Sequence, residues 1–122
     1  MPRVLIVDDA AFMRSMIKDI LVKNGFEVVG EAGNGNEAVR MVGELKPDLI
    51  TMDIVMPMKS GIDATREILD LYPDARIVIC SALGQESLVM EAMEVGAKDF
   101  IVKPFKEDQV LTVCRKFAAA QN

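Results

Sequence analysis

The sequence alternates between short apolar runs and longer stretches in which apolar residues recur at helical spacing. Short runs of this kind, bounded by charged or turn-forming residues, are typical of strands buried on both faces of a sheet. Strands are predicted at residues 3–7, 27–32, 48–52, 76–80 and 99–102, and helices at residues 11–24, 36–46, 61–72, 85–95 and 106–120. Because helical crossovers join strands in parallel, this order predicts an α/β fold with one five-stranded parallel sheet between helices.

The chain has the size and composition of one domain. Its 122 residues, of which 51% are hydrophobic, are enough to bury a core. No linker or low-complexity segment interrupts the pattern, so we expect a single domain over residues 1–122 with no effector domain. No apolar run exceeds four residues, whereas a membrane span needs about 20, so we expect a cytoplasmic protein. Cys80 and Cys114 lack metal-ligand spacing and fit reduced, buried thiols.

Charge and the absence of histidine exclude several functions. The chain carries 19 acidic against 14 basic residues, a net charge of −5, which matches nucleic acid poorly. Without histidine it can form neither a Ser-His-Asp triad nor a histidine zinc site, and it has no imidazole base. The chain is therefore excluded from chemistry that requires its own histidine side chain.

Polar residues stand at the carboxyl ends of four predicted strands. Asp8 and Asp9 follow the first strand, Asp53 the third, Ser81 the fourth and Lys103 the fifth. Carboxyl ends of parallel strands meet at one edge of the sheet, where α/β proteins bind ligands. Taken singly, an aspartate or serine here is also a good helix cap. Together they predict that three carboxylates, one hydroxyl and one ammonium group share one edge.

Three clustered carboxylates need protonation or a cation. At an effective dielectric constant near ~20 and about 5 Å separation, each pair costs roughly 3 kcal/mol. Mg²⁺ is the natural partner, because it prefers carboxylate oxygens, waters and phosphates. An ammonium group and a hydroxyl can bind phosphoryl oxygens, and a carboxylate can itself act as the nucleophile. The residues therefore predict phosphoryl transfer to an aspartate, assisted by Mg²⁺.

Four motifs, in this order, resemble those of the receiver domain of two-component response regulators. They are the acidic pair in Val7–Asp9, the phosphoacceptor segment Met52–Pro57 followed by Gly61, the Ser-Ala pair in Cys80–Ala82 and the Lys-Pro pair in Val102–Phe105. The resemblance covers nearly the whole chain. It is strongest with the single-domain members that serve chemotaxis, over residues 8–14 and 96–105.

This resemblance implies a doubly wound (βα)5 sheet of the flavodoxin-like order 2-1-3-4-5. It implies that Asp53 accepts the phosphoryl group. Asp9 and Asp53, with the backbone carbonyl of Val55, would hold Mg²⁺, and Asp8 would act largely through bound water. Lys103 would bridge to the phosphoryl group and precede a cis peptide bond to Pro104.

The resemblance also implies a switch and an output surface. Ser81 would move to bond a phosphoryl oxygen, and Phe100 would then turn inward. Val89, Met93 and Phe100 are expected on the output surface, since receivers signal through the fourth helix, fifth strand and fifth helix. Six of the eight residues from Leu88 to Val95 are apolar, more than one core-facing stripe needs. A well-buried helix is the alternative interpretation of that stretch.

The implied partners follow from the same resemblance. A CheA-like histidine kinase would donate the phosphoryl group, a motor switch or archaellum adaptor protein would receive the signal, and a phosphatase would end it. The chain would be a monomer and no classical enzyme, catalysing only its own phosphotransfer and dephosphorylation. The nearest alternative is a phosphorelay receiver that passes its phosphoryl group to a histidine-phosphotransfer protein.

Three further classes share single features with the chain. Gly33–Ala38 fits G-x-G-x-x-A, but an acidic pair beside it would repel the pyrophosphate of a dinucleotide. A haloacid-dehalogenase-like phosphatase needs Asp-x-Asp after the first strand, where this chain has adjacent aspartates. A flavodoxin-like electron carrier needs a hydroxyl-rich loop there, and this loop is acidic.

The chain departs from many relatives at several positions. Phe100 lacks the hydroxyl of the tyrosine that many relatives carry, so a switch here would act through ring packing. Lys59 is either a solvated loop lysine or a determinant of partner choice. Val55 and Leu83 occupy positions that in the family influence the hydrolytic water. Neither side chain forms hydrogen bonds, so we expect slower self-dephosphorylation than in relatives with polar residues at these positions.

Overall fold

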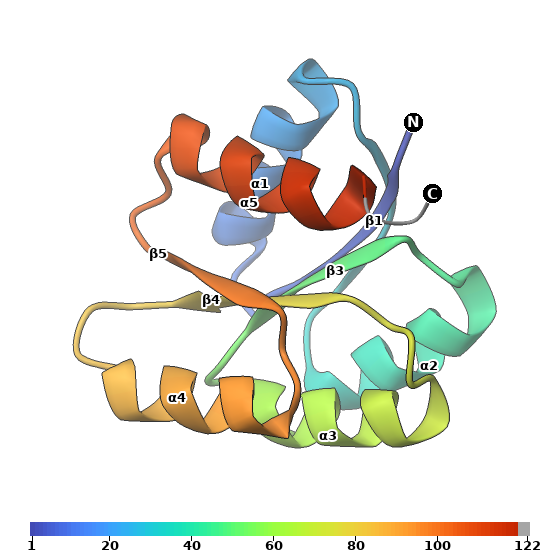
Figure 1. The fold of residues 1–122 in the computed structure, drawn as a ribbon, viewed down its shortest axis with the longest axis vertical. Helices are drawn as coiled ribbons and strands as arrows, with labels where there is room; N and C mark the ends of the chain where they lie inside the picture. Colours follow the sequence, from blue (N-terminus) through green and yellow to red (C-terminus); the bar gives the residue numbers. More distant parts are fainter. Residues whose placement is uncertain (120–122) are drawn as a thin grey trace.

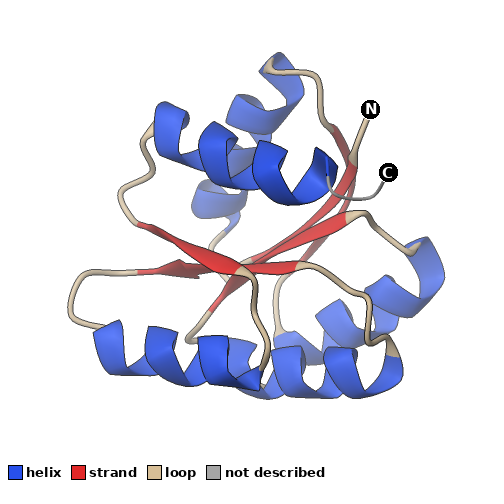
Figure 2. Cartoon of the chain, viewed as in Figure 1, coloured by secondary structure: helices blue, strands red, loops and turns tan. Residues whose placement is uncertain are grey.

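A computed structural model describes residues 1–119 as a sheet covered by helices on both faces (Figures 1 and 2). The strands are β1 (Arg3–Val7), β2 (Glu27–Ala32), β3 (Leu49–Asp53), β4 (Ile77–Ser81) and β5 (Asp99–Val102). The helices are α1 (Ala11–Lys23), α2 (Gly35–Leu45), α3 (Gly61–Leu71), α4 (Glu86–Val95) and α5 (Glu107–Ala119). The predicted alternation of five strands and five helices is confirmed.

The five strands are parallel and lie in the order β2-β1-β3-β4-β5, which confirms the expected topology. Helices α1 and α5 cover one face of the sheet, and α2, α3 and α4 cover the other (Figure 1). The chain therefore leaves β1 toward one face and β3 toward the opposite face. A crevice opens at the carboxyl edge between two such strands, and ligands of doubly wound folds bind there.

Burial on both faces explains the apolar runs. In β1, Leu5 packs beneath α2, α3 and α4, whereas Ile6 packs beneath α1 and α5, and both are at most 1% exposed. Because neighbouring side chains of a strand point to opposite faces, every position of such a strand must be apolar. Cys80 and Cys114 are free thiols, as predicted, and they are buried in the part of the core beneath α1 and α5.

Element boundaries differ from the prediction by one residue at several ends. Two strands begin and end one residue later than predicted, so Asp53 and Ser81 are the last residues of β3 and β4. Helix α2 begins earlier, at Gly35, because the Asn34 side chain accepts a hydrogen bond from the Glu37 amide. The predicted end of the last helix at Ala120 lies outside the described residues. Within residues 1–119 no helix is long and apolar enough to cross a membrane.

Candidate functional site

An acidic cluster lies at the carboxyl edge of the sheet, at the ends of β1 and β3. Carboxylate oxygens of Asp8, Asp9 and Asp53 all lie within 4.8 Å of one another. Asp8 and Asp53 are only 4% and 7% exposed, whereas Asp9 faces solvent. The Lys103 Nζ lies 2.8 Å from Asp8 Oδ2 and 3.3 Å from Asp53 Oδ1. The structure thus brings together Asp8, Asp9, Asp53 and Lys103, four of the five predicted polar residues.

The protein itself holds every polar atom of Asp8. Its amide donates to the Ala32 carbonyl at 3.0 Å, and its carbonyl accepts from Arg14 Nη1 at 2.5 Å. Its Oδ1 accepts from the Ala10 amide at 2.9 Å, and its Oδ2 accepts from Lys103. Asp9, by contrast, has no hydrogen-bond partner for its carboxylate among residues 1–119. Asp9 is therefore the more available ligand, and Asp8 is fixed as its neighbour.

Asp53 has one engaged oxygen and one without a partner. Its Oδ1 accepts from the Ile54 amide at 3.0 Å and from Lys103, whereas Oδ2 has no hydrogen-bond partner in the described part of the chain. Burial raises the Asp53 pKa to about 6, the Asp8 charge adds to this rise, and Lys103 opposes it. The Lys103 pKa is raised too: burial acts to lower it, but the hydrogen bond to Asp8 and the two carboxylate charges outweigh burial.

The loop after β3 folds back tightly onto the end of that strand. The Gly61 amide donates to the Ile54 carbonyl at 2.7 Å, and the Ser60 hydroxyl caps α3 by accepting from the Asp63 amide. This loop carries Val55, whose backbone carbonyl is the expected third metal ligand and whose side chain is exposed. The close return at Gly61 fixes where the loop can run beside the cluster.

Lys59 in this loop is not a free solvated lysine. Its ammonium group forms an ion pair with Glu67 on α3, and its side chain is largely covered. Its backbone also lies against the start of α2, where a Cβ on Gly35 would stand 2.5 Å from the Lys59 carbonyl oxygen. Lys59 therefore fastens the loop to α3, and its charge is already paired with a carboxylate outside the acidic cluster.

The donor set fits Mg²⁺. Mg²⁺ binds oxygen at about 2.0–2.1 Å, so two ligands on opposite sides of the ion stand about 4.2 Å apart. One carboxylate oxygen from each of the three aspartates lies within 4.8 Å of the other two, which is close to that spacing. Hard oxygen donors in a partly open site are what this ion prefers. Within residues 1–119 no other cluster of at least three potential metal-ligating side chains occurs.

Lys103 links the acidic cluster to Ser81 at the end of β4. The Lys103 amide donates to the Ser81 carbonyl at 2.7 Å, and the Lys103–Pro104 bond is cis, as expected. Ser81 is buried at the end of β4 and also lines a groove beside α4. A movement of Ser81 would therefore affect both the Lys103 backbone beside the acidic cluster and the wall of the groove.

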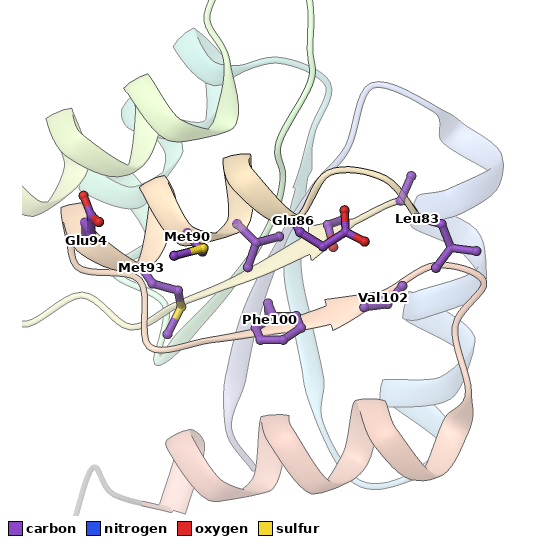
Figure 3. Close-up of a pocket in the computed structure, with 10 residues that line it drawn as sticks. Leu83, Glu86, Met90, Met93, Glu94, Phe100 and Val102 are labelled. Carbon is purple, nitrogen blue, oxygen red and sulfur yellow. The ribbon is translucent and has the colours of Figure 1, made fainter.

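An apolar groove of about 440 Å³ lies between α4 and β5 (Figure 3). Phe100 and Val102 lie along the β5 side, and Met90 and Met93 project from α4 (Figure 3). The three residues expected on the output surface all line it: Val89, Met93 and Phe100. Met90 is 65% exposed and Met93 37%, so the alternative of a well-buried α4 is wrong. The apolar residues of α4 that the core does not need, such as Met90 and Met93, line the groove.

The glycine-rich turn before α2 is closed by its own side chains. Asn34 Oδ1 accepts from the Glu37 amide, and Glu37 Oε1 accepts from the Gly33 amide at 2.7 Å. This reciprocal cap uses amide groups that a dinucleotide phosphate would need. The turn is a helix start and no dinucleotide site. None of the three clustered aspartates caps a helix, since α1 begins after Ala10 without a side-chain cap.

Sequence reasoning missed the role of Arg14, which bonds the Asp8 carbonyl and the Glu31 carboxylate. The only signal was an arginine six residues after Asp8, one helical turn into α1. Contacts to a backbone carbonyl leave no pattern in the sequence, because any residue supplies that carbonyl.

The fold and the site define a doubly wound α/β domain with a cluster of acidic residues at the carboxyl edge of its sheet, beside an apolar groove. A sequence model of the response regulator receiver domain matches residues 4–115, and the chain belongs to that family. Chemotaxis protein CheY of Thermotoga maritima is 60% identical over 114 residues, which cover 93% of this chain and 95% of that protein. Chemotaxis protein CheY of Bacillus subtilis is 62% identical with the same coverage.

A solved structure gives the same result for the fold. The CheX–CheY–BeF3–Mg²⁺ complex from Borrelia burgdorferi contains a chain that is 37% identical to this one with a TM-score of 0.89. The match covers 93% of this chain and 87% of that chain. The protein is therefore a signalling protein of the chemotaxis response regulator type.

Proposed function

We propose that this chain accepts a phosphoryl group on Asp53 from the phosphohistidine of a CheA-like histidine kinase and signals to the motility apparatus. One observation carries the proposal. The Asp53 carboxylate is buried among two other acids and Lys103, and its Oδ2 has no hydrogen-bond partner among the described residues. A buried carboxylate with a free oxygen beside an ammonium group is suited to act as a nucleophile toward phosphorus.

The proposed transfer needs no base from this chain. Asp53 Oδ2 attacks the phosphorus of the phosphohistidine, the phosphorus–nitrogen bond breaks, and the leaving imidazole nitrogen takes up a proton. Lys103 moves its hydrogen bond from Asp53 to a phosphoryl oxygen, and the Ser81 hydroxyl donates to another. The kinase supplies the histidine that this sequence lacks. The product is an acyl phosphate on Asp53.

In this proposal Asp9, Asp53 and the Val55 carbonyl hold Mg²⁺, and Asp8 acts through bound water. The Mg²⁺ of the CheY complex solved from Borrelia burgdorferi supports the choice of ion. When bound, the ion supplies positive charge that offsets the repulsion between carboxylates and phosphoryl oxygens. Asp9 suits direct binding because no described residue occupies its carboxylate.

The proposed output is a shift between two conformers of the α4–β5 region. Ser81 lines the groove and adjoins the Lys103 backbone, so its movement toward a phosphoryl oxygen would reshape the groove between Val89, Met93 and Phe100. A motor switch or archaellum adaptor protein would bind there. The CheX of the solved complex supports a CheX-like phosphatase as a further partner.

We also infer that this receiver acts in the cytoplasm as a monomer. The chemotaxis relatives also favour a motility target over the alternative of a phosphorelay intermediate.

The test is incubation with acetyl phosphate and Mg²⁺, followed by intact mass measurement. We expect one added phosphoryl group on the wild type and none on Asp53→Asn or in excess EDTA. Asp63→Asn is the matched control, since Asp63 is an exposed acid on α3, and it should be phosphorylated like the wild type. Equal phosphorylation of wild type and Asp53→Asn would show that Asp53 is not the acceptor.

A further inference from the structure

Arg14 links three segments around the acidic cluster. Its Nη1 donates to the Asp8 carbonyl at 2.5 Å, and its Nε donates to Glu31 Oε1 on β2 at 3.1 Å. The second oxygen of Glu31 lies 3.4 Å from the Lys18 ammonium, which holds that carboxylate from the other side. The Arg14 side chain is only 20% exposed and runs beside Gly33. The first turn of α1 is thereby tied to the loop after β1 and to β2.

The carbonyl that Arg14 binds belongs to the peptide unit between Asp8 and Asp9. Because a peptide unit is planar, fixing its carbonyl also fixes the direction in which the chain enters Asp9. Asp8 is held at its other polar atoms as well, whereas the Asp9 carboxylate has no partner among residues 1–119. The position of the Asp9 carboxylate therefore depends on the backbone that Arg14 holds.

We propose that Arg14 is a positioning residue of the metal site, which holds the Asp8–Asp9 peptide so that Asp9 and Asp53 can share one Mg²⁺. This inference rests on the proposed function, because it assumes that the cluster binds the ion. Groups that orient metal ligands from outside the coordination sphere typically contribute about 10- to 100-fold to metal affinity. The Glu31 carboxylate has a supporting part, since it sets the plane of the Arg14 guanidinium.

The direction of the change in Mg²⁺ affinity distinguishes a positioning role of Arg14 from an effect of its charge. Arg14 is a cation near a cation site, so its removal would tighten Mg²⁺ binding if its charge alone mattered. Positioning predicts the opposite, a loss of affinity. Lysine retains the positive charge, but one ammonium group cannot reproduce the planar fork that binds the Asp8 carbonyl and Glu31 together. Both Arg14→Ala and Arg14→Lys should therefore bind Mg²⁺ more weakly than the wild type.

The experiment is calorimetric titration of metal-free protein with MgCl₂ at pH 7.5, alongside thermal unfolding in EDTA. We expect the Mg²⁺ dissociation constant to rise about 10-fold or more in Arg14→Ala, and severalfold in Arg14→Lys. Arg66→Ala is the matched control, because it removes an arginine whose Nη1 lies 3.0 Å from Asp63 on α3. Its dissociation constant should stay within twofold of the wild type.

Each outcome has a defined meaning. An unchanged or lower dissociation constant in Arg14→Ala overturns the inference, even where its melting temperature falls, because only a structural role then remains. Wild-type affinity in Arg14→Lys also overturns it, and that variant decides the matter if Arg14→Ala does not fold. Failure of the wild type to bind Mg²⁺ refutes the proposed metal site itself. If the wild type binds Mg²⁺ and Arg14→Ala binds it equally well, only the role of Arg14 is refuted.

Discussion

Gly61 lies so close to Asp53 that a Cβ atom at position 61 would overlap the Asp53 carbonyl oxygen. The overlap lies far inside van der Waals contact, and the obstructing atom is backbone, which cannot rotate away. The Gly61 amide also donates to the next carbonyl, that of Ile54. Glycine at this position is thus required by a close approach between the start of α3 and the end of β3.

Gly61→Ala should therefore displace the loop after β3. We expect a destabilisation of about 1–3 kcal/mol, as is usual when extra atoms are forced into a packed site, together with weaker Mg²⁺ binding. Urea unfolding and titration with MgCl₂ measure the two effects. Gly33→Ala is the control, since a Cβ there meets its nearest atom at an ordinary 3.6 Å. Equal stability of the two variants would contradict the close approach.

The pKa of Asp53 gives the free energy of unfolding a predictable dependence on pH. The folded pKa is about 6, against 3.8 for an ordinary aspartate. Below about pH 4 the carboxyl is protonated in both states, so it costs no stability. As the pH rises from about 4 to 6, the unfolded chain ionises first, and stability falls. Above pH 6 the cost is complete, at most roughly 3 kcal/mol.

Asp53→Asn removes this cost. In EDTA at pH 7.5 the variant should melt at a higher temperature than the wild type, and the two should converge near pH 4. Thermal unfolding followed by circular dichroism across this pH range measures the difference. Saturating Mg²⁺ should narrow it, because the ion stabilises the charged wild-type cluster. A difference that stays constant from pH 4 to 7.5 would rule out the ionisation of Asp53 as its cause.

Lys103 offsets two buried carboxylates, so Lys103→Met should be strongly destabilising at neutral pH. Removing one partner of a buried ion pair typically costs about 3–5 kcal/mol. The loss should shrink toward pH 4, because the Asp53 carboxyl, whose pKa is raised to about 6, is protonated there and no longer needs a cation. Lys98→Met, at an exposed position in the turn before β5, should have a small effect at both pH values. Chemical unfolding at pH 7.5 and pH 4 tests this, and a pH-independent loss would contradict it.

Val55→Asn should shorten the lifetime of the phosphorylated protein. Val55 is exposed and lies two residues after Asp53, so an amide there can orient a water molecule toward the acyl phosphate. One such hydrogen bond, at about 1.4 kcal/mol, corresponds to about a tenfold change in rate. Loss of the phosphoryl group is followed by intact mass after removal of acetyl phosphate.

Met58→Asn serves as the control for this prediction. Met58 lies in the same loop, is more exposed than Val55 and has a positive φ of 70°, which asparagine accepts readily. Its phosphoryl lifetime should match that of the wild type. Equal lifetimes in wild type and Val55→Asn would mean that a hydrogen-bonding side chain at position 55 does not promote hydrolysis.

The sequence was sufficient to predict the fold and the residues at the sheet edge, because both follow from periodicity. Strands such as β1, with Leu5 and Ile6 buried on opposite faces, leave an unmistakable apolar run, and the polar residue that ends each run marks the edge. The hydrogen-bond and ion-pair partners of individual side chains could not be predicted in the same way. The Lys59 pair with Glu67 and the Arg14 bond to the Asp8 carbonyl depend on how α1, α3 and the loops pack, which no local pattern encodes.

The hydrogen bond between Lys103 and Asp8 joins residues that are 95 positions apart in the chain. Asp8 leaves the ribosome 95 residues before Lys103, so a chain that ends before Lys103 cannot assemble this site. Contacts of such long sequence separation form late, after the intervening chain has been ordered. Assembly of the acidic cluster with Lys103 is thereby tied to completed folding of residues 8–103.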